Sequence, residues 1–589
     1  MEVNTPPRPI EPKHHKSWVE VVKDFSAESS FLHVFGAIVI RALLALCLGP
    51  MEENLSQKRW FATVFCFAVF LSALVSVPHW IHILSPQYQG IPVHFNADEY
   101  SYLPRVQEVL TGKLNRFGVA IAGGEELLPA LQPGLIEQAY GLFFRSITDQ
   151  AFDVFTVMDF VAPILLFIVM VGFCRACQLS RRRALVVAVL FSLLELYNLG
   201  RPIHQCMSFL LVLLSLWGLI EGLEGRWLRG LLGGVLMGLL VGVYFWSFSA
   251  AWAWWGLLLL YVLLQRSWSD AGKLLLFGAA GLVAGSPFLL AMRRLSEHPL
   301  YEEAFFRSGV GHSHMPESWP WTILFFVMAA GLLVLWRRSS RPSVYIVCTV
   351  VAAFVLLNQH LVHGVLFLFA SHYLFFLVFA AVLTLVSLWG DRSKWSIAAS
   401  LAAAVFLLGI AYDNRSVISQ WRIDAEDFSE QHLASALPMF DKLGRSVILA
   451  DPLTSSFIAS HTKHDVLFTH YIQHELRSHQ EIAERYCLTQ LPFVPDQRHP
   501  EGEPVLIYGA AYDTLYTNAE KARLREQELA LVDRTCATMD LDPRALLGEY
   551  RVQYFFWDEK RQPEWKVPML NIPVREVARG EGWSLWKIL

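Results

Sequence analysis

Long apolar segments separated by short loops recur along the chain, and this pattern constrains the fold more than any other feature. A bilayer core about 30 Å thick requires roughly 20 apolar residues in a helix, and about eleven segments approach that length. These segments are 59–84, 152–175, 184–198, 206–222, 230–246, 249–265, 274–292, 320–336, 343–357, 374–390 and 395–413. The 589 residues are 54% hydrophobic and only 17% charged. Because one soluble core cannot bury so much apolar surface, the pattern predicts a polytopic α-helical membrane protein.

The basic residues of the short loops predict the direction of the spans. One set of alternate loops carries about 13 Lys and Arg residues, whereas the opposite set carries only Arg201. The opposite set consists of the loops near 198–205, 247–249 and 358–373. The positive-inside rule places the basic set in the cytoplasm. We therefore expect the N-terminus inside and the chain after residue 413 outside.

The segment 31–50 disturbs this pattern, because it is apolar but contains His33 and Arg41. If it spanned the membrane, the loop that follows the next span would move to the cytoplasm and break the charge asymmetry. We therefore interpret it as an interfacial or re-entrant helix on the inner face.

The tail after residue 413 has the polar composition of a soluble domain. Short β-type runs at 446–450, 505–508 and 551–556 alternate with helical stretches at 475–488 and 518–533. Strands that alternate with helices predict a small C-terminal soluble α/β domain. The predicted parts are a cytoplasmic N-terminus with the interfacial helix (1–58), a transmembrane domain with a long first outer loop at 85–150 (59–413), and the C-terminal domain (414–589).

Charge and cysteine content limit the partners of the chain. The formal net charge of −4 provides no basic field that would attract nucleic acid, so we expect no nucleic-acid partner. Cys487 and Cys536 are the two cysteines of the predicted outer tail. They could form a disulfide in an oxidising compartment, or both could remain free thiols.

Adjacent acids in the first outer loop are the main candidates for chemistry. Asp98 and Glu99 follow the first predicted span and precede a helical stretch. A carboxylate at the boundary between water and lipid can deprotonate a hydroxyl, or bind a metal that neutralises a phosphate leaving group. The structural alternative is that Asp98 caps the helix that Val106, Val109 and Leu110 continue.

The arrangement of these features resembles the GT-C superfamily of glycosyltransferases, which use polyprenyl-phosphate-linked sugars as donors. An acidic first outer loop, a helix after it, many membrane helices and an outer C-terminal domain carry the resemblance. Its motifs are Asp98-Glu99-Tyr100 followed by Arg105-Val106-Gln107-Glu108-Val109-Leu110, the short loop Gly200-Arg201-Pro202-Ile203, and Asn358-Gln359-His360 with Ser371-His372-Tyr373.

The resemblance implies that Asp98 or Glu99 is the general base. Asp98 would deprotonate the acceptor, Glu99 would support it or bind a divalent metal, and Tyr100 and Arg105 would line the cavity. Oligosaccharyltransferases of this superfamily carry a Trp-Trp-Asp motif in the outer domain. Here Trp254-Trp255 lies within a predicted span and precedes Gly256, which disfavours that activity.

Arginines on the predicted outer side are candidates for binding the donor phosphate. They are Arg201, Arg293, Arg294 and Arg307. The guanidinium fork suits a phosphate, and positive charge on the outer side runs against the usual bias. The alternative is a rim salt bridge, either Arg294 with Glu297 or Arg307 with Glu302 or Glu303.

His312 and His314 form an H-x-H motif in the loop near 293–319. In an extended segment both imidazoles face one side and could bind a phosphate or a metal, with Asp98 as a third metal ligand across the cavity. The alternative is a solvated loop that carries two exposed histidines.

The segment 358–373 is too apolar for an ordinary loop, and we expect it to dip back into the membrane. Polar residues at its ends would then line a cavity. They are Asn358, Gln359, His372 and Tyr373. The alternative is structural hydrogen bonding at helix ends.

These observations predict a GT-C-type glycosyltransferase of a bacterial inner membrane, surrounded by membrane lipids. It would transfer a hexosyl or pentosyl group from a polyprenyl-phosphate-linked donor to a lipid, glycan or protein acceptor on the periplasmic face. One alternative is a transporter or flippase of lipid-linked saccharides, which would place polar residues through the middle of the membrane. Another is a non-catalytic scaffold, in which Asp98, Arg201 and His312 would not share a cavity.

Overall fold

The computed structural model describes most of the chain after residue 55. The described residues are 56–93, 99–112, 121–122, 131, 133–201, 203, 205–308, 310–339, 343–367, 370–414, 426–493, 517–539 and 542–589. Residues Lys58–Leu589 form one compact unit. The predicted interfacial helix at 31–50, the candidate base Asp98 and the predicted strand at 505–508 lie outside the described residues.

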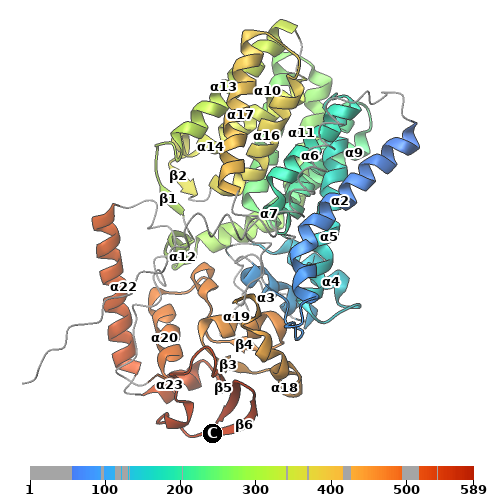
Figure 1. Cartoon of the computed structure of the whole chain (residues 1–589). Coiled ribbons are helices and arrows are strands. Elements are labelled where there is room, and N and C mark those ends of the chain that lie inside the picture. The colour runs from blue at the N-terminus through green and yellow to red at the C-terminus, as the bar shows by residue number, and fades with distance from the viewer. Residues whose placement is uncertain are drawn as a thin grey trace, which may run out of the picture. The chain divides into compact units, whose positions relative to one another are not determined.

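Among the described residues, eight helices are long and apolar enough to cross a membrane. They are α2 (Gln57–Ile83), α5 (Ala151–Ala176), α8 (Cys206–Leu223), α10 (Phe245–Leu264), α11 (Trp268–Ser296), α13 (Trp319–Ser339), α14 (Val344–Asn358) with its continuation α15 (His360–His363), and α17 (Lys394–Asp413). Shorter helices occupy the other predicted spans, namely α6 (Arg181–Leu194), α9 (Trp227–Leu239) and α16 (Leu374–Ser387). The helices form one bundle (Figure 1), which confirms the predicted polytopic helical fold.

Two short helices follow the first span. Helix α3 (Glu99–Leu110) begins at the acidic motif, as the sequence predicts, and α4 (Leu135–Phe144) packs on it. The apolar side chains Leu103, Val106 and Val109 of α3 are fully buried, since their spacing of three residues places them on one face of the helix. Through its buried side chains α3 packs against α4, α5 and the helix at 452–461 of the C-terminal part.

The C-terminal part is built on a mixed five-stranded sheet in the order β4-β3-β5-β7-β6. The strands are β3 (Val447–Leu449), β4 (Asp465–Val466), β5 (Val552–Asp558), β6 (Val574–Gly580) and β7 (Trp583–Ile588). Strand β3 pairs in parallel with β4 and β5, whereas β7 pairs antiparallel with β5 and β6. The sheet contains the predicted strands at 446–450 and 551–556, and β6 and β7 extend it beyond the prediction.

Helices cover this sheet, as the α/β pattern predicts (Figure 1). They include α19 (Pro452–His461), which contacts β4, and α20 (His479–Gln490), whereas α22 (Asn518–Met539) packs on α20. The Asp451 carboxylate accepts from the first backbone N–H groups of α19, and Pro452 begins that helix. The chain between β3 and β4 therefore turns sharply into α19, which contacts α3 of the first loop.

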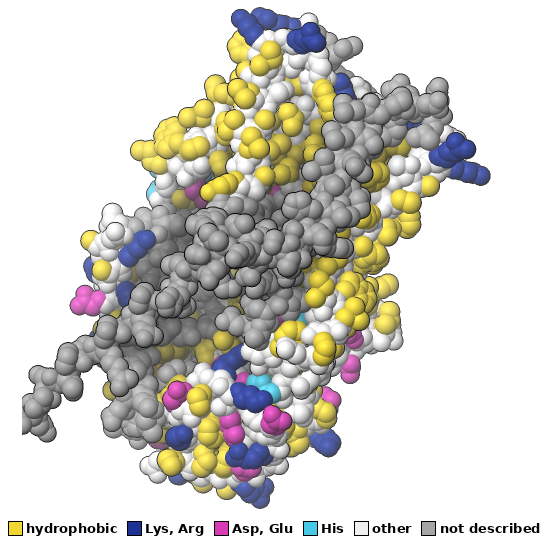
Figure 2. Space-filling model, viewed as in Figure 1, with side chains coloured by type: hydrophobic (Ala, Val, Ile, Leu, Met, Phe, Trp, Pro, Cys, Tyr) yellow, Lys and Arg dark blue, Asp and Glu magenta, His cyan; other side chains and the backbone are white. Residues whose placement is uncertain are grey.

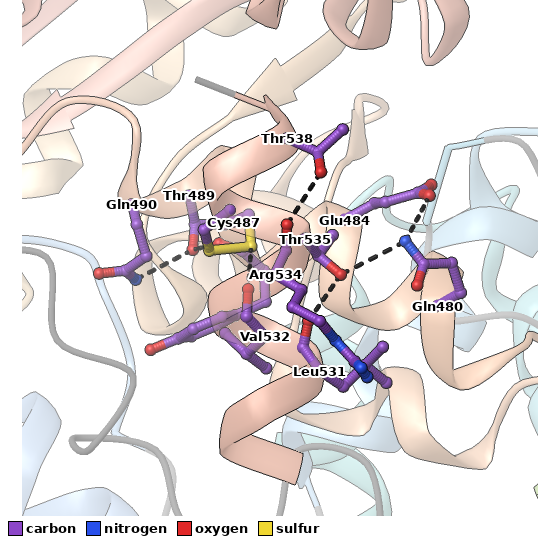
Figure 3. The surroundings of a disulfide bond; sticks show 12 residues. Gln480, Glu484, Cys487, Thr489, Gln490, Leu531, Val532, Arg534, Thr535 and Thr538 are labelled. Atoms are coloured by element: carbon purple, nitrogen blue, oxygen red, sulfur yellow. Dashed lines mark hydrogen bonds between the residues drawn. A yellow bond between two sulfur atoms is a disulfide. The ribbon is translucent and has the colours of Figure 1, made fainter. Parts of the chain in front are cut away.

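A disulfide joins α20 to α22 between Cys487 and Cys536 (Figure 3). The Gln480 side chain also donates to the Thr535 hydroxyl at 3.3 Å, so the two helices are held at two points. Of the two alternatives that the sequence leaves open for these cysteines, the structure contains the disulfide.

We expect the disulfide to stabilise the C-terminal part. The bond closes a long loop, because its cysteines lie 49 residues apart. Replacing both Cys487 and Cys536 by Ser should lower the free energy of unfolding by roughly 2–4 kcal/mol, measured as a fall in melting temperature. Cys66→Ser, at an exposed free cysteine, should leave the melting temperature unchanged. Rapid alkylation of Cys487 and Cys536 in the unreduced protein would contradict the bond.

Candidate functional site

Three buried ionisable side chains meet where α2, α3 and α5 approach one another. They are His79 of α2, Glu99 of α3 and Asp159 of α5, which are 7%, 4% and 1% exposed. One potential ligand atom from each lies within 4.8 Å of the others. The His79 Nε2 atom is 2.9 Å from Asp159 Oδ2. The cluster therefore brings the acidic motif of the first loop against two membrane-spanning helices.

Burying two carboxylates and an imidazole away from water costs free energy unless the charges are compensated. A protonated His79 paired with Asp159 compensates part of the charge. A divalent cation held by His79, Glu99 and Asp159 would compensate more of it, because carboxylate oxygens and imidazole nitrogens are ordinary metal ligands. Within the described part of the chain, this is the one group of His, Cys, Asp and Glu with such a spacing.

Buried polar contacts fix the position of α3, which carries Glu99. The Arg105 guanidinium lies 3.4 Å from the Glu137 carboxylate of α4, and both side chains are buried. Burial raises the pKa of Glu137, and the positive charge of Arg105 opposes that rise. The Gln107 side chain donates to Asp149 O at 2.9 Å and accepts from Ala151 N at 2.8 Å. These bonds attach α3 to α4 and to the start of α5.

Tyr100 lies on α3 and is only partly buried. Burial raises its pKa, with a further contribution from Glu430 of the C-terminal part, while Arg561 acts in the opposite direction. Tyr100 therefore faces charged groups of the C-terminal part.

Arg201 lies beside a buried acid in the short segment after α6. The Asn198 amide donates to Glu195 Oε2 at 2.7 Å, and Glu195 is fully buried. The Arg201 guanidinium lies 5.8 Å from the centre of the Tyr197 ring and interacts electrostatically with Glu195 and His372. A half-buried Arg in this position provides a positive charge shortly after the helix α7 (Leu196–Leu199).

The other predicted arginines have different surroundings. Arg293 and Arg294 are exposed in the last turn of α11, and Arg293 pairs with Glu297 at 3.5 Å. The sequence predicts Arg294 as the partner of Glu297, whereas in the structure that partner is Arg293.

Arg307 ends α12 (Tyr301–Arg307) and is 1% exposed. Its guanidinium donates to Glu303 at 3.2 Å, the predicted rim partner. It also donates to three backbone carbonyls of the C-terminal part, those of Gln473, Glu475 and Arg477. Burial lowers its pKa to about 10, and Glu303 opposes that shift. Because these acceptors account for the guanidinium, we leave Arg307 out of the proposed phosphate site.

His312 and His314 lie at the two-stranded ribbon of β1 (Val310–His312) and β2 (Val365–Phe367). Both side chains are exposed, and their ring centres are 5.1 Å apart. The His314 Nδ1 atom is 3.1 Å from Leu361 O. Neither histidine belongs to the buried cluster described above.

The segment that follows α14 is held by side-chain hydrogen bonds. Asn358 accepts from Thr322 at 2.8 Å, and the Gln359 amide donates to the Tyr373 hydroxyl at 2.8 Å. His372 hydrogen-bonds to the Tyr244 hydroxyl and stacks on Trp246, with ring centres 4.3 Å apart. His372 and Tyr373 also line a small cavity. These two residues therefore make structural hydrogen bonds and line a cavity at the same time.

Sequence reasoning named Glu99 but missed its two partners as site residues. Asp159 gave a signal, because an acid within a span is costly and is often functional. Asp159 also lies near one end of the predicted span 152–175, where an acid can reach water without any functional role. His79 gave no comparable signal, since a single histidine near a span end has many structural uses.

The fold and the site together define a polytopic membrane protein with a buried acid–imidazole cluster beside its first loop. Comparison of the sequence with protein-family models and with curated proteins gives no match.

Solved structures similar to this chain include oligosaccharyltransferase AglB from Archaeoglobus fulgidus, in complex with an inhibitory peptide and a dolichol-phosphate. It is 11% identical with a TM-score of 0.41, over 86% of this chain and 70% of that chain. ArnT from Cupriavidus metallidurans bound to undecaprenyl phosphate is 13% identical with a TM-score of 0.43, over 90% of this chain and 98% of that chain. The apo form of the Archaeoglobus fulgidus oligosaccharyltransferase is 11% identical with a TM-score of 0.43.

We expect Arg307 to matter for stability. Arg307→Met leaves three carbonyls and Glu303 without this donor, and should lower the free energy of unfolding by roughly 3 kcal/mol. The measurement is the melting temperature of the purified protein. Arg294→Met, at an exposed arginine of α11, is the matched control and should leave the melting temperature unchanged. An Arg307→Met protein with an unchanged melting temperature but no activity would instead point to phosphate binding.

Proposed function

We propose that this chain is a GT-C-type glycosyltransferase that transfers a sugar from a polyprenyl-phosphate donor to an acceptor hydroxyl. The observation that carries the proposal is the buried cluster of His79, Glu99 and Asp159. It brings the acidic motif, through which the sequence resembles GT-C enzymes, into contact with two membrane-spanning helices. A lipid-linked substrate must be met at such a boundary, because its phosphate lies in water while its chain stays in the membrane.

The chemistry follows from the groups at the cluster. A carboxylate of the Asp98-Glu99 pair accepts the proton of the acceptor hydroxyl, and the oxygen attacks the anomeric carbon. The bond from that carbon to the phosphate oxygen breaks, with inversion, and negative charge develops on the lipid phosphate. Arg201 is the arginine that we assign to stabilise that charge, because it is half-buried beside Glu195 and Tyr197. Arg293 and Arg294 are further candidates for binding this phosphate.

The cluster also suits a divalent metal ion, which would be held by His79, Glu99 and Asp159. When bound, such an ion would neutralise charge on the donor phosphate. The close approach of His79 Nε2 to Asp159 Oδ2, at 2.9 Å, orients the imidazole. The bonds of Arg105 and Gln107 hold α3, and so keep Glu99 facing the two other side chains.

The proposed location is a bacterial inner membrane, with the N-terminus in the cytoplasm and the C-terminal part in the periplasm. The Lys and Arg asymmetry of the short loops supports this orientation. The Cys487–Cys536 disulfide supports it independently, because disulfides persist in oxidising compartments such as the periplasm.

A transporter or flippase of lipid-linked saccharides is the second candidate. The buried acids Asp159 of α5 and Glu195 at the end of α6 favour it, because such groups often mark transport pathways. A transferase makes a new covalent glycan, whereas a flippase only relocates one. Mass spectrometry of the cell-envelope glycans separates these two functions.

We predict that Glu99→Gln lowers transfer by at least about 100-fold, because it removes a proton acceptor or metal ligand. Asp98→Asn tests the other candidate base in the same way. The measurement is mass spectrometry of cell-envelope glycans in a deletion strain that carries each variant, compared with its parent. Loss of one sugar unit in the deletion strain would identify the transferred group.

Glu302→Gln is the matched control, because Glu302 is an exposed acid of α12 away from the cluster. It should restore the parental glycans when expressed at the same level. If the Glu99→Gln and Asp98→Asn variants both restored the parental glycans fully, neither carboxylate would be the general base. An unchanged glycan structure that accumulates on the wrong side of the membrane would favour the flippase.

We also predict that Asp159→Asn weakens binding of Mn²⁺ at least about tenfold. Mn²⁺ titration of the purified protein, followed by electron paramagnetic resonance, measures this directly. His312→Asn removes an imidazole outside the cluster and should leave the affinity unchanged. If His312→Asn weakens binding and Asp159→Asn does not, the metal site lies at the H-x-H motif instead. Melting temperatures of both variants control for unfolding.

A further inference from the structure

We propose that the C-terminal part binds a saccharide in a cavity lined by α20, α22 and the chain that begins α23 (Pro543–Glu549). The cavity has a volume of about 400 Å³, within the range of roughly 300–1,000 Å³ that is typical of small-molecule sites. None of its lining residues belongs to the cluster of His79, Glu99 and Asp159. The inference therefore does not depend on the proposed activity.

The walls of the cavity are held in place before any ligand binds. The disulfide between Cys487 and Cys536 joins α20 to α22. The Gln480 amide of α20 donates to the Thr535 hydroxyl of α22 at 3.3 Å and to the Glu484 carboxylate at 3.0 Å (Figure 3). Polar groups that are already fixed lose little conformational entropy when a ligand binds. The cavity is therefore preformed for binding.

The polar side chains around the cavity combine donors with acceptors. Arg534 of α22 is exposed and offers a planar fork of N–H donors. The Glu484 carboxylate accepts from the Tyr550 hydroxyl at 2.9 Å, and a carboxylate has further acceptor positions. The Asp542 carboxylate accepts from Ala545 N at 3.2 Å and is a second acceptor at the cavity. A ligand that both donates and accepts hydrogen bonds matches this lining.

Apolar side chains form the rest of the lining. They are Leu531 and Met539 of α22 and Leu546 of α23. Met539 is 2% exposed, and the other two are half-buried. A sugar ring presents C–H groups on its faces and hydroxyls around its edge. Such a ring suits a cavity that is apolar in part and hydrogen-bonding in part.

Other classes of small ligand fit this cavity less well. A phosphate or another anion would meet the carboxylates of Glu484 and Asp542, and like charges repel. A metal ion would meet Arg534, and among the described residues the group with metal-ligand spacing is the cluster that contains His79. An apolar molecule would deprive the polar side chains of water without replacing its hydrogen bonds. A neutral molecule with many hydroxyls avoids all three costs.

The cavity belongs to the part of the molecule that meets water. Figure 2 shows charged side chains of both signs over the C-terminal part, whereas hydrophobic side chains predominate over the membrane helices. Gln480 and Arg534 are exposed at the cavity. A saccharide dissolved in water can therefore reach it.

The test is binding of trisaccharides to the purified full chain in nanodiscs, measured by titration with saturation-transfer-difference NMR. The neutral probes are maltotriose, mannotriose and N-acetylchitotriose. Trigalacturonate is the anionic probe, and trialanine is the peptide comparison. We expect a neutral trisaccharide to bind, and trigalacturonate to bind at least about tenfold more weakly, because Glu484 and Asp542 repel its carboxylates.

Arg534→Met and Glu484→Gln each remove hydrogen bonds to the saccharide and should weaken its binding at least about tenfold. Arg523→Met is the matched control, because Arg523 is an exposed arginine of α22 that does not line the cavity. It should leave the affinity unchanged, and melting temperatures of all three variants control for unfolding.

Three results would overturn the inference. The first is that no neutral trisaccharide binds at concentrations up to about 10 mM. The second is that trialanine binds and no trisaccharide does. The third is that Arg534→Met and Glu484→Gln both bind the saccharide as tightly as the parent protein.

Discussion

The compensation of charge at His79, Glu99 and Asp159 is the interaction on which the rest of this account depends. Two carboxylates and an imidazole cannot remain buried beside membrane helices unless they pair with one another or with a cation. That requirement holds α3 at the end of α2 and against α5. The same pairing packs α3 of the first loop against the helical bundle.

The same loop is bound on its other side by the C-terminal part. The Ala122 amide donates to Val466 O at 2.8 Å, and Ile121 pairs with the edge strand β4. The Arg477 guanidinium donates to Ala122 O. Arg307 adds a second connection from α12 to the segment that contains Arg477. The C-terminal part therefore contributes to the position of the first loop as well as covering it.

Much of the fold follows from the sequence, because period and composition determine it. Apolar length predicts the spans, and the helix after the acidic motif follows from the spacing of Val106 and Val109. The strands β6 and β7 were not predicted, since Val574–Gly580 alternates weakly and carries three charged residues. Their antiparallel pairing depends on a partner strand that no local pattern specifies.

The site was predictable only in part. Glu99 belongs to a recognisable motif, whereas Asp159 and His79 join it through the packing of helices that are distant in sequence. Arg307 is predicted as a phosphate ligand but binds backbone carbonyls instead. The local sequence around a basic residue on the predicted outer side is the same in both cases. Only the three-dimensional contacts distinguish these roles.

The most direct test of the central claim is a cryo-electron microscopy map of the full chain in nanodiscs with an added polyprenyl phosphate. We expect phosphate density beside Arg201, within about 3 Å of its guanidinium. Phosphate density at a place remote from both Arg201 and the cluster would contradict the account.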